Sequence, residues 1–330
     1  MRTKILSKKN IIQKNTHKKK FKAGKLSYKS KITNKLKKRL YKVFYITILI
    51  ITKFFLIIKK NKEVKNKTNN LYETDDVTLV TGLFQIDNNR HKFEDYFIWV
   101  NKLLQINKPI IFFTQSNLSS ILKEKRPKKY DKKTIFIEKN ISEFYSYKNY
   151  LQAFKETYII DIAKFKHTVE LYIVWSEKVN FLNESIEKNY FKSKYFFWVD
   201  AGLLRKEDII KFVNDWPCIE KLKKDPRVIL NGIRKIKNNE YNKLMNFDII
   251  THYKFMNDYN VAAGFFGGRY DYLKQFIKYY YEILELFYKN KVFIGSEQNL
   301  FTIVGYSHPE IVNIINSGDF DFLKNYLLPK

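Results

Sequence analysis

From about residue 77 onward, short apolar runs alternate with segments whose apolar residues recur at helical spacing. Runs rich in β-branched and aromatic residues predict buried strands over 77–83, 109–114, 134–137, 195–199 and 261–266. Apolar side chains every three or four residues predict helices from Phe93 to Leu104, from Leu171 to Ile186 and from Leu273 to Phe287. Such alternation is typical of an α/β domain. We therefore predict one domain over 77–330, with a mostly parallel sheet flanked by helices.

The segment before this domain differs from it in composition. Residues 1–39 are polar and basic without apolar periodicity, which predicts a disordered tail. Residues 40–60 are strongly apolar but contain Lys53, and we predict a single transmembrane signal anchor there. A helix on the membrane surface, or a segment packed against the domain, are the alternatives. Residues 61–76 are polar and predict a stem that joins anchor and domain.

The distribution of charge argues against a nucleic-acid-binding protein. Residues 1–62 hold 21 Lys and Arg and no acidic residue, whereas the rest holds 41 basic and 33 acidic residues. The net charge of +29 therefore comes mostly from the N-terminal arm. The body is only mildly basic and carries no nucleic-acid-binding motif. A basic segment in front of an anchor predicts a single-pass type II membrane protein with a cytoplasmic N-terminus.

Cysteine and histidine give little support for a metal site. Cys218 is the single cysteine, so neither an intrachain disulfide nor a cysteine-based zinc site can form. The five histidines are scattered and show no His-x-x-x-His spacing. His308 is the one near the segments discussed below, and it is retained as a candidate metal ligand.

The segment 197–202 (Phe-Trp-Val-Asp-Ala-Gly) holds the sharpest chemical feature of the sequence. Asp200 follows a buried strand, and parallel sheets bind ligands where their strands end. Ala201 and Gly202 are small, so a large ligand can approach the backbone closely. Alternatively, Asp200 caps a helix that begins near Lys206 or pairs with Arg205.

Three further segments each have a structural and a functional interpretation. The glycine-rich segment 262–268 predicts a tight strand-to-helix turn or a turn beside a ligand, and it is neither a dinucleotide fingerprint nor a P-loop. In segment 295–300, Glu297 and Gln298 lie in the predicted first turn of a helix. An acidic residue there stabilises the helix, so its presence needs no functional explanation. Lys178 borders an apolar stripe, so it either meets a diphosphate or extends into solvent.

Taken in order, these segments resemble the HtrL/YibB family, whose members are thought to have a GT-A-like glycosyltransferase fold. The resemblance rests on 79–84 (Leu-Val-Thr-Gly-Leu-Phe), 109–114 (Pro-Ile-Ile-Phe-Phe-Thr), 175–178 (Trp-Ser-Glu-Lys), 197–202, 266–268 (Phe-Gly-Gly) and 297–298 (Glu-Gln). The order of strand, Asp-x-x, Gly-Gly and acidic helix start is also similar to retaining GT-A enzymes.

The resemblance implies a role for each matching residue. The residues implied to bind the nucleotide-sugar are Thr81 and Gly82 at base and ribose, Arg90 and Lys178 at the diphosphate, Asp200, Ala201 and Gly202 near ribose and metal, Gly267 and Gly268 at the sugar, and Gln298. Asp200 stands where the first Asp of a GT-A Asp-x-Asp motif stands. Glu297 stands where an acidic residue faces the reacting sugar carbon, as nucleophile or as a group that orients the acceptor.

Metal binding is where the chain departs from the family pattern. Gly202 replaces the second Asp of Asp-x-Asp, which is normally the firmer ligand of Mn²⁺ or Mg²⁺. One carboxylate with waters holds a divalent ion weakly. An inverting enzyme would use Glu297 or another acid as general base, and the sequence leaves the stereochemical outcome open.

The sequence thus predicts a membrane-tethered glycosyltransferase of the hexosyltransferase type. It would take a nucleoside-diphosphate sugar as donor and a glycan, lipid or protein as acceptor. The alternative is a non-catalytic GT-A-like module that binds a nucleotide or a partner, which the missing second Asp favours.

Overall fold

The computed structural model describes residues 77–86, 91–205, 211–212, 216–247, 260–319 and 321–328. The predicted tail (1–39), anchor (40–60) and stem (61–76) lie outside the described residues, as does Arg90. Among the helices that are described, none is long and apolar enough to cross a bilayer.

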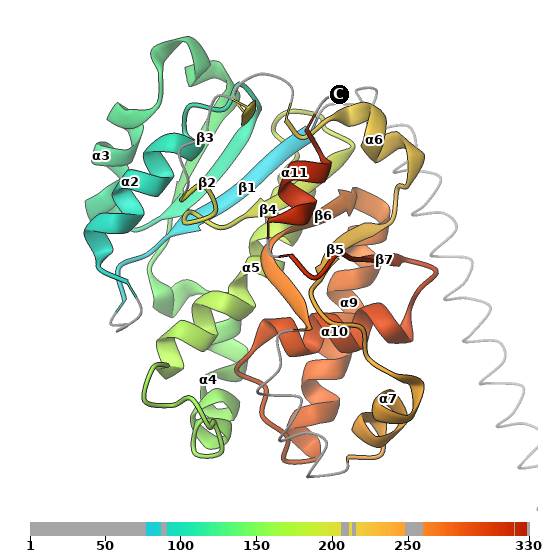
Figure 1. Ribbon diagram of the computed structural model, residues 1–330. Helices are drawn as coiled ribbons and strands as arrows, with labels where there is room; N and C mark the ends of the chain where they lie inside the picture. The colour runs from blue at the N-terminus through green and yellow to red at the C-terminus, as the bar shows by residue number, and fades with distance from the viewer. Residues whose placement is uncertain are drawn as a thin grey trace, which may run out of the picture. The chain divides into compact units, whose positions relative to one another are not determined.

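A seven-stranded sheet forms the centre of the described chain, in the order β3-β2-β1-β4-β6-β5-β7 (Figure 1). Its strands are β1 Val77–Leu83, β2 Ile110–Thr114, β3 Thr134–Glu138, β4 Tyr195–Val199, β5 Val228–Gly232, β6 Val261–Arg269 and β7 Val312–Asn316. Strand β6 runs antiparallel to both of its neighbours, β4 and β5, and the other pairs are parallel. The predicted mostly parallel sheet flanked by helices is therefore confirmed.

The strands predicted from the sequence agree closely with β1, β2, β3 and β4, and the main difference is at β6. The prediction ended that strand at Phe266 and placed the following glycines in a turn. In the structure β6 continues to Arg269, and helix α9 (Tyr270–Lys289) follows directly. Gly267 pairs with Phe197, and a Cβ at this position would lie 2.2 Å from the carbonyl oxygen of Phe196. The glycine is thus required by close strand pairing, and the predicted turn was wrong.

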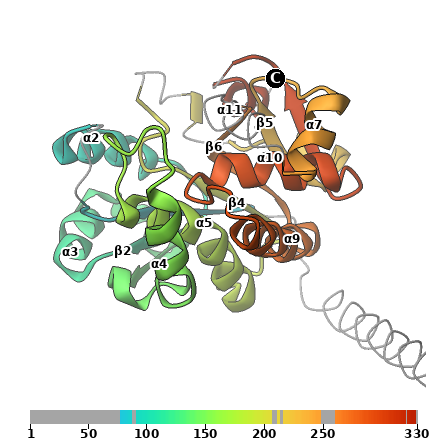
Figure 2. The same cartoon turned by 90° about the horizontal axis from the view of Figure 1, so that it is seen from below.

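Helices cover both faces of the sheet. One face is covered by α4 (Tyr145–Tyr158), α5 (Val169–Lys188), α9 and α10 (Glu297–Ser307), and α7 (Asn238–Met245) packs into the same core. The opposite face is covered by α2 (Phe93–Leu103), α3 (Ser116–Lys125), α6 (Ile219–Lys224) and α11 (Phe322–Tyr326). Figure 2 shows α4, α5 and α9 together on their side, away from α2 and α11. The two short 3₁₀ helices span Lys128–Lys133 and Ile141–Glu143.

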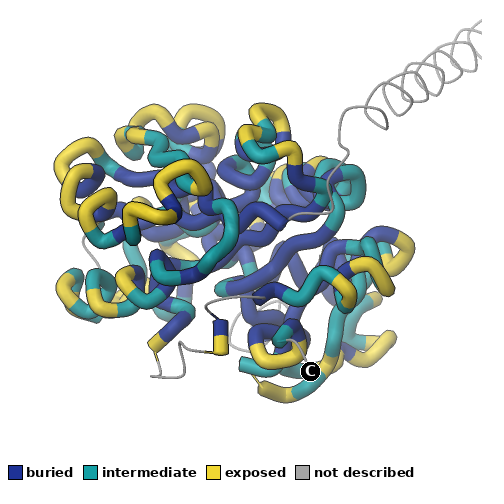
Figure 3. The backbone as a smooth tube through the Cα atoms, turned by 90° about the horizontal axis from the view of Figure 1, so that it is seen from above, coloured by how far each residue is buried: buried dark blue, intermediate teal, exposed yellow. Residues whose placement is uncertain are grey.

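Alternation along the strands divides the core into two layers. In β4, Phe196 and Trp198 face α5 and α9, whereas Tyr195 and Phe197 face the opposite core. All five residues of β4 are buried, because side chains on both faces are covered by helices. Figure 3 shows this buried central sheet beneath more exposed helices and loops. The carboxyl ends of β1 and β4 therefore lie at the edge of a hydrophobic core.

Candidate functional site

A cavity of about 460 Å³ opens at the carboxyl ends of β1 and β4. Residues from β1, α2, α5, β4, β6, α10 and the C-terminal segment line it. Its volume lies within the range of small-molecule sites, which are usually apolar with a few well-placed polar groups. This is the edge at which mostly parallel sheets bind ligands.

The carboxylate of Asp200 is held at this edge by β4, β6 and the neighbouring indole. The backbone N–H of Asp200 donates to the carbonyl of Gly264 at 2.8 Å, which continues the β4–β6 pairing one step past the strand. The indole N–H of Trp198 donates to Asp200 Oδ1 at 2.6 Å. With 38% of its side chain exposed, Asp200 is accessible to a ligand in the cavity.

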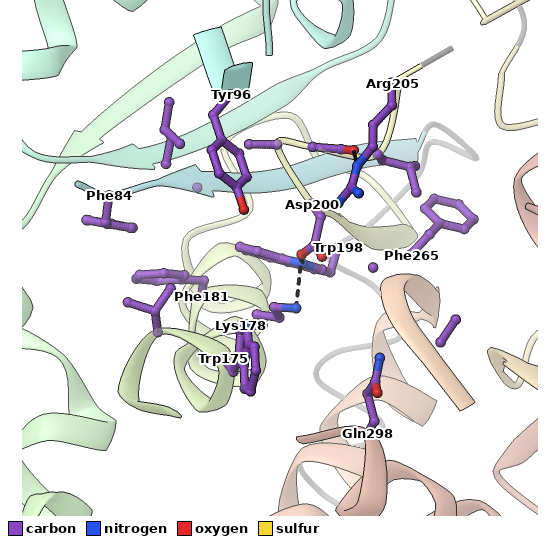
Figure 4. A pocket seen from close by; sticks show the side chains of 18 of the residues that line it. Phe84, Tyr96, Trp175, Lys178, Phe181, Trp198, Asp200, Arg205, Phe265 and Gln298 are labelled. Atoms are coloured by element: carbon purple, nitrogen blue, oxygen red, sulfur yellow. Dashed lines mark hydrogen bonds and ion pairs between the residues drawn. The ribbon is translucent and has the colours of Figure 1, made fainter. Parts of the chain in front are cut away.

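Lys178 contacts two carboxylates that come from different parts of the chain, and Figure 4 shows its ion pair with one of them, Asp200. Its Nζ atom is 3.0 Å from Asp200 Oδ1 and 2.8 Å from Glu297 Oε1. Helix α5 carries Lys178, whereas Glu297 is the first residue of α10. The side chains of Lys178 and Glu297 are each only 5% exposed, so the ammonium does not extend into solvent. The predicted alternative of a surface lysine at this position was wrong.

Burial and charge act in opposite directions on this lysine. Burial is the largest single influence and lowers the pKa of Lys178, but Asp200 and Glu297 together raise it above its ordinary value. The side chain is therefore a charged ammonium at neutral pH. A buried charge without partners would be strongly unfavourable, and here two carboxylates and their hydrogen bonds compensate for it.

Aromatic, polar and cationic side chains line the cavity wall. Phe84, Trp175 and Phe181 lie together on one side in Figure 4, whereas Gln298 and Phe265 lie on the other. Arg205 adds a positive charge to the wall, and its Nε donates to the carbonyl of Gly202 at 2.9 Å. Its guanidinium also stacks over the ring of Trp99 at 4.7 Å. The cavity thus offers flat apolar surfaces beside cationic groups.

The structure brings many of the predicted site residues to this cavity. Those that line it are Gly82, Lys178, Asp200, Ala201, Gly202 and Gln298. Glu297 is within hydrogen-bond distance of Lys178 but lies behind it and does not line the cavity. Arg90 is not among the described residues. Asp200 pairs with Lys178, and no ion pair with Arg205 is present among the described residues.

Four predicted residues lie elsewhere. Thr81 is fully buried in strand β1, next to Gly82, and does not line the cavity. Gly267 and Gly268 lie in the second half of β6, opposite Phe197 and Phe196, and do not line the cavity. His308 stacks on Tyr279 with ring centroids 3.6 Å apart and also contacts Glu310. Its place at the end of α10 is outside the cavity wall.

Sequence reasoning missed several residues of the site. Gly264 lines the cavity, and a Cβ there would lie 3.2 Å from Asp200 Oδ2. The glycine-rich segment 262–268 indicated a glycine beside the ligand. Only the direction of strand β6 shows that this glycine is Gly264 and not Gly267. Tyr96, Asn231 and Lys324 also line the cavity and carry no local motif that marks them.

The described residues do not fit a divalent metal at Asp200. None of their His, Cys, Asp and Glu side chains form a group of three or more that could hold an ion. Asp200 Oδ1 already accepts the indole N–H of Trp198 and contacts the Lys178 ammonium. A cation bound to this oxygen would therefore lie beside a positive charge.

Fold and site together define an α/β protein with a ligand cavity at the carboxyl edge of a mostly parallel sheet. Residues 75–327 match the family described as bacterial protein of unknown function, HtrL_YibB. The chain belongs to the HtrL_YibB family. None of the curated proteins matches it.

Several solved structures are similar to this chain at low sequence identity. Core-mannan synthase A of Aspergillus fumigatus, in its Mn/GDP form, has a TM-score of 0.40 and 12% identity, with 74% of this chain and 73% of that chain covered. The mannosyltransferase Ktr4p of S. cerevisiae has a TM-score of 0.36 and 10% identity, with 70% and 67% covered. The 4-diphosphocytidyl-2C-methyl-D-erythritol synthase of Anaerococcus prevotii has a TM-score of 0.34 and 10% identity, with 77% and 96% covered.

Proposed function

We propose that this protein is a membrane-tethered glycosyltransferase that moves a hexosyl group from a nucleoside-diphosphate sugar to an acceptor hydroxyl. The acceptor class is a glycan, a lipid or a protein. One observation carries the proposal: Lys178 joins the carboxylates of Asp200 and Glu297 at the carboxyl edge of the sheet, on the wall of a cavity of about 460 Å³. This arrangement supplies both signs of charge that glycosyl transfer requires.

In this reaction the bond between the anomeric carbon and the phosphate oxygen breaks, and a bond to the acceptor oxygen forms. The nucleoside diphosphate leaves with added negative charge, while positive character develops at the anomeric carbon. Lys178, Arg205 and Lys324 are the cationic side chains on the cavity wall that favour departure of the diphosphate. Asp200 faces the cavity, so it is the carboxylate that we place next to the sugar.

Glu297 then has a different role from the one that the family resemblance implies. Because its side chain is only 5% exposed and lies behind Lys178, we assign it the task of holding the ammonium in place. Asp200, with 38% of its side chain exposed, is better placed to meet a sugar ring or an acceptor hydroxyl. In this proposal Asp200 acts on the substrate, and Glu297 acts through Lys178.

The apolar side of the cavity suits a flat ring of the donor. Phe84, Phe181 and Trp198 lie on the wall near Gly82, and Phe181 stacks against Phe84 with ring centroids 5.7 Å apart. Aromatic faces bind bases and the apolar faces of sugars through stacking and burial of surface. The cationic groups lie on the neighbouring part of the wall, so one extended donor can contact both surfaces.

The membrane tether is proposed from the sequence of residues 40–60. A basic arm followed by an apolar segment and a polar stem favours a type II orientation with a cytoplasmic N-terminus. Expression of the full chain should place it in the membrane fraction, where it resists extraction by alkaline carbonate. Release by carbonate would overturn the proposed anchor and leave the transferase proposal untouched.

Release of nucleoside diphosphate from a panel of nucleotide-sugars, by the full chain in detergent, tests the enzymatic activity. Asp200→Asn is expected to lower turnover by about 100-fold or more while the protein stays folded. Glu310→Gln is the matched control, because Glu310 is exposed and lies outside the cavity wall. Full activity of Asp200→Asn would show that the chemistry lies elsewhere.

A second candidate function has a specific observation in its favour. Asp200 and Glu297 both contact Lys178, as in an internal ion pair that stabilises a fold. A non-catalytic module that binds a nucleotide or a partner would show this arrangement without turnover. Binding of a nucleoside diphosphate with no release from any nucleotide-sugar, in the presence of varied acceptors, would favour this candidate.

A further inference from the structure

Asp200 Oδ1 is already surrounded by donors. The Trp198 indole N–H lies 2.6 Å from this oxygen, and the Lys178 ammonium lies 3.0 Å from it. A divalent ion binds a carboxylate oxygen at about 2.0–2.6 Å. At that distance from Oδ1 an ion would crowd the ammonium, and the two positive charges would repel each other. The place of a metal at Oδ1 is thus taken by a side chain of the protein.

Glu297 is a second carboxylate that contacts the Lys178 ammonium. Its Oε1 lies 2.8 Å from Lys178 Nζ, and its side chain is almost fully buried. Two ionised carboxylates that approach a common point from separate elements repel each other, and a cation between them removes this repulsion. Lys178 supplies that cation from helix α5, and the two acidic residues come from the end of β4 and the start of α10.

The ammonium also retains a donor for a ligand. A lysine has three N–H groups, and Asp200 and Glu297 accept two of them. Lys178 lines the cavity, so its remaining N–H is available on the side where a ligand would bind. An oxygen of a phosphate is a strong acceptor for such a charged donor.

We propose that Lys178 is the resident cation of this site: it bridges Asp200 and Glu297 and donates to the donor diphosphate, which binds without a divalent metal ion. The identity of the ligand in this proposal rests on the proposed function. The bridging role of the ammonium does not, because it follows from the arrangement of the three side chains alone.

The first test compares binding to the full chain in detergent with and without metal. Nucleoside diphosphates are titrated by calorimetry, once with EDTA and once with Mn²⁺ in place of EDTA. The expected Kd is the same within about threefold under both conditions. An affinity that rises about tenfold or more with Mn²⁺, and loses this gain in Asp200→Asn, would overturn the proposal.

The second test removes the internal cation and uses no nucleotide. Lys178→Met keeps a long side chain but no charge, so Asp200 and Glu297 are left facing each other. The variant is expected to take up Mn²⁺, seen as loss of the free-ion signal in electron paramagnetic resonance, while the wild type does not. A folded Lys178→Met protein that binds no Mn²⁺, or a wild type that binds it through Asp200, would contradict the bridging role.

A matched double variant makes this second test specific. Lys178→Met with Glu297→Gln has one carboxylate in place of two, so it should lose the Mn²⁺ uptake gained by the single variant. If Lys178→Met does not fold, the comparison of EDTA and Mn²⁺ on the wild type still decides the question. If no nucleoside diphosphate binds under any condition, the proposed function fails, and the Mn²⁺ experiment still reports on Lys178.

Discussion

The indole N–H of Trp198 donates a hydrogen bond to Asp200 Oδ1 at 2.6 Å, two residues further along the chain. Trp198 is the fourth residue of β4 and faces the core that α5 covers, whereas Asp200 follows the strand and faces the cavity. The hydrogen bond thus connects the hydrophobic core to the carboxylate that a ligand would meet. It restricts Asp200 to one orientation, with Oδ1 toward Lys178.

Trp198→Phe should lower activity more than stability. The substitution keeps an aromatic ring in the core but removes the donor to Asp200. A hydrogen bond to a charged group contributes about 1.5–3 kcal/mol, so turnover should fall by about tenfold or more. Initial rates and thermal unfolding of the two proteins measure this. Trp175→Phe, on the same cavity wall, is the control and should change turnover much less.

Two glycines of β6 should respond differently to alanine. Gly264→Ala places a Cβ 3.2 Å from Asp200 Oδ2, so the carboxylate must shift by a few tenths of an ångström. We expect a clear loss of turnover with little loss of stability. Gly267→Ala places a Cβ 2.2 Å from the Phe196 carbonyl oxygen, which forces strands β4 and β6 apart. Chemical denaturation should show a loss of about 3 kcal/mol or more for this variant. Equal stability of the two variants would contradict this assignment.

The buried carboxyl of Glu177 should make stability fall as pH rises. Burial raises the pKa of Glu177, although hydrogen bonds from Ser146, Asn180 and Tyr145 act in the opposite direction. The folded protein therefore holds this proton at pH values where the unfolded chain has lost it. The resulting stability is complete below the unfolded pKa and is lost as pH rises through the folded value.

Comparison with Glu177→Gln isolates this contribution. The free energy of unfolding of the wild type, relative to the variant, should fall by up to about 1.4 kcal/mol per pH unit within that window. Denaturant unfolding from pH 4 upward measures the difference. A constant difference between wild type and Glu177→Gln would refute the raised pKa.

Tyr172→Phe should destabilise the protein most at neutral pH. The Tyr172 hydroxyl donates to Asp161, which also contacts His167 Nδ1 at 2.8 Å. Burial raises the pKa of Asp161, but hydrogen bonds from His167 and Tyr172 outweigh it and lower the pKa below its ordinary value. This stability is present above the unfolded pKa and is lost as pH falls through the folded pKa.

Removing the hydroxyl should therefore cost about 1–3 kcal/mol at neutral pH and progressively less in acid. Unfolding curves of wild type and variant at several pH values check this expectation. Tyr288→Phe removes a hydroxyl that donates to Glu156 on the surface, and it serves as control with little effect at any pH. If Tyr172→Phe loses as much stability in acid as at neutral pH, the loss does not come from the interaction with Asp161.

The apolar pattern placed five of the seven strands and the helices α2, α5 and α9, but not α3 or α4. Strands β1 and β4 begin and end where the sequence predicts, because each is a short run rich in β-branched, aliphatic or aromatic residues that forms a strand buried on both faces. The edge strand β7 and the short strand β5 were missed. In β7 three residues are only partly buried, so the apolar signal is weak there.

The sequence also determined which residue types are present at the ends of these elements: an aspartate after β4, a lysine on α5 and a glutamate at the start of α10. Only the tertiary structure decided that the three side chains meet, because Lys178 and Glu297 are 119 positions apart and their distance depends on how α5 and α10 pack. It also decided that Gly264 lines the cavity and Gly267 does not. Strand β6 runs antiparallel to its neighbours, so its first residues lie at the carboxyl edge of the other strands. Strand direction is a property of the sheet as a whole, and no local pattern of residues encodes it.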